Sequence, residues 1–190
     1  MIVVSDTSPL NYLVLIDAID VLPQLFGEVH VPPAVMQELQ HPRTPELVKR
    51  WTQSPPDWLL IQSPSSTAPL DPKLDPGEAA AIALALELRA VAILVDEKKG
   101  RRIAMEKGLA TLGTITVLEL AAERELLDLP TALDALRHTS FHVTRALIDT
   151  ALQRDAARKR AKQSDSDETV QAEYRSRTAR RFYTHQSRRD

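Results

Sequence analysis

The sequence predicts an α/β protein with a short, mostly parallel central sheet. Short apolar runs alternate along the chain with segments whose apolar residues recur at helical spacing. The clearest run, VAILV at 91–95, is apolar throughout, as is typical of a parallel strand that is covered on both faces. A length of 190 residues is enough for one domain with its own core and some additional chain.

Predicted strands and helices alternate in the first half of the chain. We expect strands at 2–5, 29–31 and 58–61, and helices that begin near 8, 32 and 45. Prolines near the start of the first two helices support this, because the proline ring already holds a helical φ angle. The segment 63–74 is rich in proline and serine, which predicts a surface loop.

The second half opens with the best defined predicted helix, which runs from about Pro76 to Arg89. Asp75 is a suitable N-cap, and Glu78 occupies the third helical position. The interior of this helix is apolar nearly all round, so we expect it to be buried. Further elements follow: a strand at 91–95, a helix at 97–107 closed by Gly108, a weak strand at 109–112, helices at about 115–127 and 131–138, and a last helix with Val143, Ala146, Leu147 and Ala151 on one face.

The composition excludes several classes of protein. The chain has no cysteine, which excludes a disulfide scaffold, a cysteine-ligated zinc finger and a cysteine nucleophile. No apolar run reaches the roughly 18 residues that a membrane span needs, so we expect no membrane partner. The N-terminus lacks the basic leader of a secretory signal, and we expect a cytoplasmic protein.

The charge is divided unevenly along the chain. Residues 154–190 hold 11 Lys and Arg against 6 Asp and Glu, whereas residues 1–153 hold 13 against 20. We therefore expect an acidic folded domain at 1–155 and a basic, poorly ordered tail at 156–190. Such a tail could bind RNA or another polyanion, or it could be a solvated extension without a partner.

Four carboxylates occupy positions from which they could meet. Asp6 directly follows the first predicted strand and Asp96 directly follows the strand at 91–95, so both should emerge at the carboxyl edge of the sheet. Glu38 and Glu78 lie on predicted helices that could reach this edge. Converging carboxylates repel one another unless a cation neutralises them. Oxygen ligands without cysteine or clustered histidine favour Mg²⁺ or Mn²⁺, and such an ion suits phosphodiester hydrolysis.

Each acid also has a purely structural explanation. Asp6 and Asp96 could cap the helices that follow them, and Glu78 could complete a capping box with Asp75. Glu38 could be a solvated helix residue. From the residues alone, both explanations stay open.

Five segments of the sequence resemble the PIN-domain nucleases, and most closely their VapC-like branch, DUF3368. The segments are VVSDTSPLNYL (3–13), VHVPPAVMQEL (29–39), LDPGEAAAIALA (74–85), VAILVDEKKGRRIA (91–104) and GLATLGTITVL (108–118). The resemblance covers about residues 2–145. It implies a three-layer α/β/α fold with a short parallel sheet, and a ribonuclease that uses Mg²⁺ or Mn²⁺.

The resemblance also implies roles for individual residues. The catalytic, metal-binding acids would be Asp6, Glu38, Glu78 and Asp96, with Ser8 and Glu97 in support. The third acid is a glutamate where many relatives have aspartate, and no fifth acid stands at 113–114.

The basic residues after Asp96 are a further prediction. Lys98, Arg101 and Arg102 could hold substrate phosphates, since acids alone would repel RNA. They could equally form a solvated helix face with ordinary ion pairs.

The resemblance places the protein as the toxin of a type II toxin–antitoxin pair. A small antitoxin would cover the acidic edge, and a homodimer is expected. Two alternatives remain: a catalytically inactive PIN-fold module that binds RNA or protein, and a phosphotransfer or phosphatase domain. The second is weaker, because Ser8 stands where a second aspartate would follow Asp6.

Overall fold

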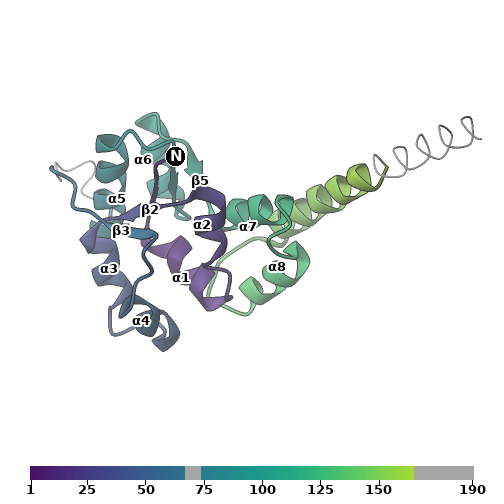
Figure 1. Cartoon of the computed structure of the whole chain (residues 1–190), viewed down its shortest axis with the longest axis horizontal. Coiled ribbons are helices and arrows are strands. Elements are labelled where there is room, and N and C mark those ends of the chain that lie inside the picture. The colour runs from purple at the N-terminus through teal and green to yellow at the C-terminus, as the bar shows by residue number, and fades with distance from the viewer. Residues whose placement is uncertain (67–73, 165–190) are drawn as a thin grey trace, which may run out of the picture.

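A computed structural model of the chain describes residues 1–66 and 74–164 (Figure 1). Its centre is a five-stranded parallel sheet with the strand order β3-β2-β1-β4-β5. Helices flank this sheet, which confirms the predicted three-layer α/β/α architecture (Figure 1). The strands are β1 (Val3–Ser5), β2 (Val29–Val31), β3 (Leu59–Ile61), β4 (Ala92–Leu94) and β5 (Thr111–Leu112).

The helices lie close to the predicted positions. They are α1 (Thr7–Leu15), α2 (Val21–Phe26), α3 (Pro33–Leu39), α4 (Glu46–Thr52), α5 (Pro76–Glu87), α6 (Lys98–Glu106), α7 (Thr114–Glu123) and α8 (Leu129–Arg137), followed by an unlabelled helix at 145–164. In the described ranges, none of these helices has the length and apolar character to cross a membrane. The middle of the predicted loop, residues 67–73, lies outside the described residues.

Strand β1 is the middle strand of the sheet and the point where the strand order reverses. It pairs with β2 on one side and with β4 on the other. The backbone N–H of Asp6 continues the second pairing by donating to the carbonyl of Leu94 at 2.9 Å. Because ligands of open α/β sheets bind where the strand order reverses, the carboxyl ends of β1 and β4 are the expected place for a site.

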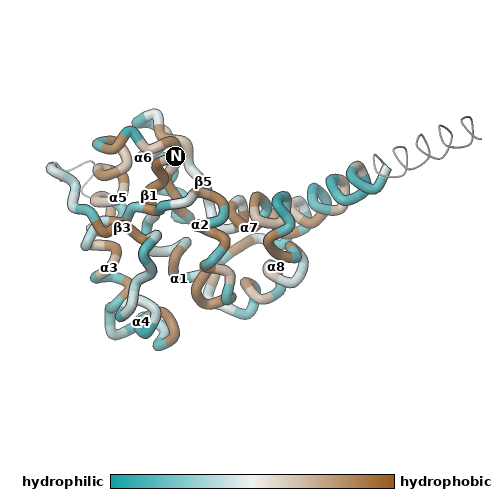
Figure 2. The backbone as a smooth tube through the Cα atoms, in the orientation of Figure 1, coloured by the Kyte–Doolittle hydropathy of each residue, from teal (hydrophilic) through white to brown (hydrophobic). Residues whose placement is uncertain are grey.

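The core lies around the two central strands. All residues of β1 and β4 are buried, and α5 packs on both strands and against α3. Helix α5 is buried along most of its length, as its apolar sequence predicts. Figure 2 shows the hydrophobic segments gathered in the body, while the helix at 145–164 becomes hydrophilic where it projects from it.

The last helix corrects two predictions. It begins at 145, so Val143 precedes it, and Leu147 is 47% exposed while Ile148 and Ala151 are buried. The predicted end of the domain at 155 falls inside the helix, and residues 156–164 are helical rather than poorly ordered. The remainder of the expected tail, 165–190, lies outside the described residues.

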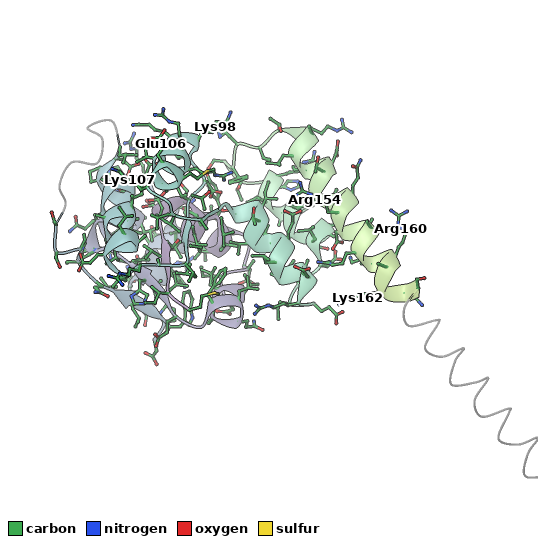
Figure 3. All side chains as sticks on the ribbon, turned by 90° about the horizontal axis from the view of Figure 1, so that it is seen from above. Lys98, Glu106, Lys107, Arg154, Arg160 and Lys162 are labelled. Carbon is green, nitrogen blue, oxygen red and sulfur yellow. The ribbon has the colours of Figure 1, made fainter. Side chains whose placement is uncertain are left out.

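Ion pairs join this helix to the body of the protein beyond its apolar residues. Three of its basic side chains reach acids near α7 and α8, with N···O distances of 2.6 to 3.3 Å: Arg154 to Glu119, Lys159 to Asp128 and Lys162 to Glu125. Arg158 pairs with the buried Asp155 on the same helix. Figure 3 shows Arg160 on the side that points away from the body. Much of the basic charge in 154–164 is thus balanced by acids of the chain itself.

Candidate metal centre

Asp6 is a buried carboxylate at the carboxyl end of β1. Its side chain is only 2% exposed, and it occupies the N-cap position of α1 without a capping hydrogen bond from the side chain. Its Oδ1 has no hydrogen-bond partner among the residues that the structure describes. Burial raises the pKa of Asp6 well above its ordinary value, and the charges of Asp75, Glu78 and Glu38 raise it further. Capping therefore does not account for this side chain.

Glu38, in the last turn of α3, reaches the N-termini of two other helices. Its Oε1 accepts from the backbone N–H of Gly77 at 2.7 Å, and its Oε2 accepts from Thr7 Oγ1 at 2.5 Å. A Cβ atom at position 77 would overlap the carboxylate of Glu38, so glycine is required for this approach. Burial raises the pKa of Glu38 despite these hydrogen bonds. Glu38 is a tertiary link and not a solvated helix residue.

Asp75 lies beside Asp6 and Glu38, a proximity that the sequence analysis missed. One carboxylate oxygen from each of these three residues lies within 4.8 Å of the other two. Asp75 also caps α5 as predicted, because its Oδ1 accepts from the backbone N–H of Glu78 at 2.7 Å. The cap uses one oxygen of the carboxylate, which has two. From the sequence, this second oxygen was the one indication that Asp75 could have a further role.

Glu78 lies in the first turn of α5 and is only 3% exposed. Its Oε1 faces α6, where a Cβ atom at Gly100 would come within 2.5 Å of it. In the described part of the chain this oxygen has no hydrogen-bond partner. Burial first, and then the charges of Asp75 and Glu97, raise the pKa of Glu78 from 4.5 to about 7. Its helix position alone does not explain a buried, unpartnered carboxyl group.

Asp96 follows β4 at the same edge of the sheet but is held by α7. Its Oδ1 accepts from the backbone N–H of Thr114 at 2.7 Å, and its Oδ2 accepts from Thr114 Oγ1 at 2.6 Å. The N-cap of α6 is Glu97, so Asp96 does not cap the helix that follows it. Burial raises the pKa of Asp96, while Thr114 and the nearby Arg101 oppose the increase. Asp96 is therefore on the predicted edge, but outside the group formed by Asp6, Glu38 and Asp75.

The two supporting candidates lie near different acids. Ser8 is half-buried in the first turn of α1 and lines a hollow together with Thr7 and Glu38. Glu97 is exposed, and its charge raises the pKa of both Glu78 and Asp96. Both residues are thus next to the predicted acids.

The three basic candidates lie on α6 and differ in their surroundings. Arg101 is half-buried, and its Nη2 donates to the carbonyl of Val95 at 3.3 Å close to Asp96. Lys98 and Arg102 are exposed, and Arg102 Nη1 lies 3.8 Å from Glu106 Oε1. Figure 3 shows Lys98 projecting from the body. Only Arg101 directly adjoins one of the acids.

The acids fit a hard divalent cation. The donor atoms are all carboxylate oxygens, which Mg²⁺ and Mn²⁺ prefer. Asp6 keeps a buried oxygen that has no hydrogen-bond donor among the described residues, and the charge of Asp75 contributes to the raised pKa values of Asp6, Glu38 and Glu78. A cation would remove both sources of unfavourable energy.

Comparison with known proteins found one matching family. The family model of DUF3368, a PIN domain, matches residues 2–157. No curated protein and no solved structure matches the chain. The matched range extends from β1 into the helix at 145–164 and contains every acid described above. The chain belongs to the PIN-domain family DUF3368.

Proposed function

We propose that this protein is a divalent-metal-dependent ribonuclease that hydrolyses phosphodiester bonds in RNA. The observation that carries the proposal is the buried Asp6 carboxylate, which meets other acids where the strand order of a PIN-domain sheet reverses. A buried carboxylate oxygen that has no hydrogen-bond donor in the described part of the chain is unfavourable for the fold, which supports a role in binding a cation.

The acids of the site would hold Mg²⁺ or Mn²⁺. Asp6 and Glu38 are neighbours, and Thr7 and Gly77 fix the orientation of Glu38 by hydrogen bonds. Glu78 and Asp96 bring further carboxylates to the same edge. When bound, the cation would polarise the scissile phosphate, lower the pKa of the attacking water and offset charge on the leaving oxygen. Ser8 would support Glu38, and Glu97 would support Glu78 and Asp96.

The basic residues of α6 would hold the RNA backbone beside the acids. Lys98 and Arg102 are exposed and lie at the open surface of α6 together with Arg101. Their positive charge would offset the repulsion between RNA and the acidic edge.

The biological setting is part of the same proposal. The family resemblance supports the toxin of a type II toxin–antitoxin pair, which acts in the cytoplasm. A small antitoxin would cover the acidic edge with a lysine or arginine near the carboxylates, and two copies of the chain would form a homodimer.

An RNA cleavage assay tests the proposal. The full chain is incubated with single-stranded and hairpin RNAs in Mn²⁺, in Mg²⁺ and in EDTA. We expect cleavage that requires the metal and that falls by about a hundredfold or more in Asp6→Asn. Asp128→Asn is the matched control, because Asp128 caps α8 far along the chain from these acids. Full cleavage by Asp6→Asn and Asp96→Asn would overturn the proposal.

One observation favours the alternative of an inactive PIN-fold module that binds RNA or protein. Thr114 satisfies both oxygens of Asp96, which leaves this carboxylate well bonded in the absence of a cation. The same assay separates the two functions, since an inactive module would bind RNA and cleave none at any Mn²⁺ concentration.

A further inference from the structure

We infer that Asp75, and not Glu78, is the third carboxylate that binds the divalent cation together with Asp6 and Glu38. This inference rests on the proposed metal-dependent function and amends it at one ligand. The family resemblance assigns the third position to Glu78, and the chain offers two acids, Asp75 and Glu78, at the start of α5.

The distances favour Asp75. One oxygen each of Asp6, Glu38 and Asp75 lies within 4.8 Å of the other two. Two oxygens on opposite sides of an octahedral Mg²⁺ lie about 4 Å apart, so a small closure of this group would make a coordination site. Asp75 is exposed, and its side chain can therefore move by this amount without disturbing the core.

The hydrogen-bond partners of Asp6 and Asp75 also support this assignment. Asp6 is 98% buried, and its Oδ1 lacks a donor among the described residues, so this group is built for an additional partner. Asp75 accepts the N–H of Glu78 with Oδ1, and a carboxylate that accepts a hydrogen bond can still ligate a metal through its other lone pairs. Such hydrogen bonds commonly orient metal ligands.

Glu78 is directed elsewhere. It is buried against α6, where its Oε1 lies so close to Gly100 that a Cβ atom there would be 2.5 Å away. Among the residues that the structure describes, Glu78 Oε1 lacks a hydrogen-bond donor just as Asp6 Oδ1 does, but Glu78 does not belong to the close group of carboxylate oxygens, so the distances decide between Glu78 and Asp75. In this inference Glu78 lies next to the three ligands and adds negative charge to the site, but it does not contact the ion.

The test is an isothermal titration calorimetry experiment in which the full-length protein is titrated with Mn²⁺ in the absence of RNA. Asp75→Asn and Glu78→Gln each remove one negative charge from the same cluster, and asparagine preserves the N-cap. We expect Asp75→Asn to weaken Mn²⁺ binding about tenfold or more, and Glu78→Gln to weaken it by less than about threefold. Asp75→Ser, which also preserves the cap, should match Asp75→Asn.

Two controls separate ligation from other effects of the substitution. Asp128 caps α8 through the N–H of Thr131 as Asp75 caps α5, so Asp128→Asn should leave Mn²⁺ affinity unchanged. Repeating the titration at 0.1 and 0.5 M KCl separates the loss of a direct ligand from the loss of a long-range attraction between the carboxylate and the ion. Salt screens the long-range attraction of exposed charges. The loss in Asp75→Asn should persist at 0.5 M KCl.

Each result decides the inference. A larger loss in Glu78→Gln than in Asp75→Asn, or a loss in Asp75→Asn that disappears at 0.5 M KCl, would overturn it. A wild-type protein that binds Mn²⁺ but cleaves no RNA removes the ribonuclease proposal, and the same titrations still decide the ligand. A wild-type protein that binds no Mn²⁺ overturns both.

Discussion

Glu38 of α3 accepts a hydrogen bond from the backbone N–H of Gly77 at the start of α5, 39 residues further along the chain. The contact is close enough that any side chain at position 77 would meet the carboxylate. It joins the helix after β2 to the helix before β4. The position of Glu38 beside Asp6 therefore depends on a glycine in a different element.

Gly77→Ala should displace Glu38 while the fold survives. The overlapping atoms belong to the end of a flexible side chain, so the carboxylate can move away for about 1–3 kcal/mol of overpacking. We expect Mn²⁺ affinity to fall about tenfold, since a metal-binding group loses its support. Gly100→Ala is the matched variant, because it displaces Glu78 in the same way. Calorimetric titration, with circular dichroism to verify folding, should show the larger loss for Gly77→Ala.

The metal-free protein should become less stable as the pH rises from about 4.5 to about 7. Glu78 has a pKa of about 7 in the folded protein and an ordinary value near 4.5 in the unfolded chain, so the folded state binds its proton more tightly. The stabilisation is complete below the unfolded pKa and is lost as the pH passes the folded pKa. For this one group the upper bound is about 3 kcal/mol.

Urea unfolding in EDTA between pH 4 and pH 8 measures this effect. Glu78→Gln should reduce the slope, because glutamine does not titrate. The stabilisation produced by Mn²⁺ should have the opposite trend and grow with pH, since the ligands bind the ion as carboxylates. A free energy of unfolding that rises between pH 5 and pH 7 in EDTA would contradict the prediction.

Thr114→Val should remove a hydrogen bond to Asp96 and lower the free energy of unfolding. Thr114 is fully buried, and valine fills the same space but removes the hydroxyl that donates to Asp96 Oδ2. A hydrogen bond to a charged group contributes about 1.5–3 kcal/mol, and we expect a loss of this size in urea unfolding at pH 8. Thr114→Ser keeps the hydroxyl and should keep the hydrogen bond, with about 1 kcal/mol lost for the missing methyl group. Equal unfolding curves for wild type and Thr114→Val would show that the bond is unimportant.

Charge reversal on α6 should reduce the salt dependence of RNA binding. Each phosphate contact that is lost lowers the slope of log affinity against log salt by about 0.7 for single strands. We expect this change for Lys98→Glu and for Arg102→Glu, measured in EDTA to prevent cleavage. Lys107→Glu is the control, because Lys107 caps the other end of α6 (Figure 3). Identical slopes for all three variants would favour a solvated helix face.

The sequence was sufficient to predict the positions of those site residues that lie at the ends of strands. Asp6 directly follows β1 and Asp96 comes two residues after the end of β4, so their common edge is a consequence of the parallel sheet alone. The position of Glu38 could be suggested but not fixed, since it depends on how α3 packs against α5. Asp75 was missed because its role as an N-cap was a sufficient explanation, and local sequence does not reveal where its second oxygen lies.

The last helix shows the same limit. Apolar spacing predicted Ala146, Leu147 and Ala151 on one buried face; Ala151 is buried, but Ala146 and Leu147 are exposed and Ile148 is buried instead. The pattern also predicted an early end, because apolar residues become sparse after Arg158. Ion pairs to Glu119 and Asp128 extend the ordered region, and such long-range pairs leave no periodic signal in the sequence.

The middle position of β1 has a consequence for protein synthesis. Asp6 is made early, its neighbours Glu38 and Asp75 come later, and the Thr114 that holds Asp96 comes later still. A nascent chain that ends at β4 therefore contains Asp6, Glu38 and Asp75 but lacks Asp96 and the threonine that orients it. The acidic edge is therefore complete only after translation has passed the start of α7.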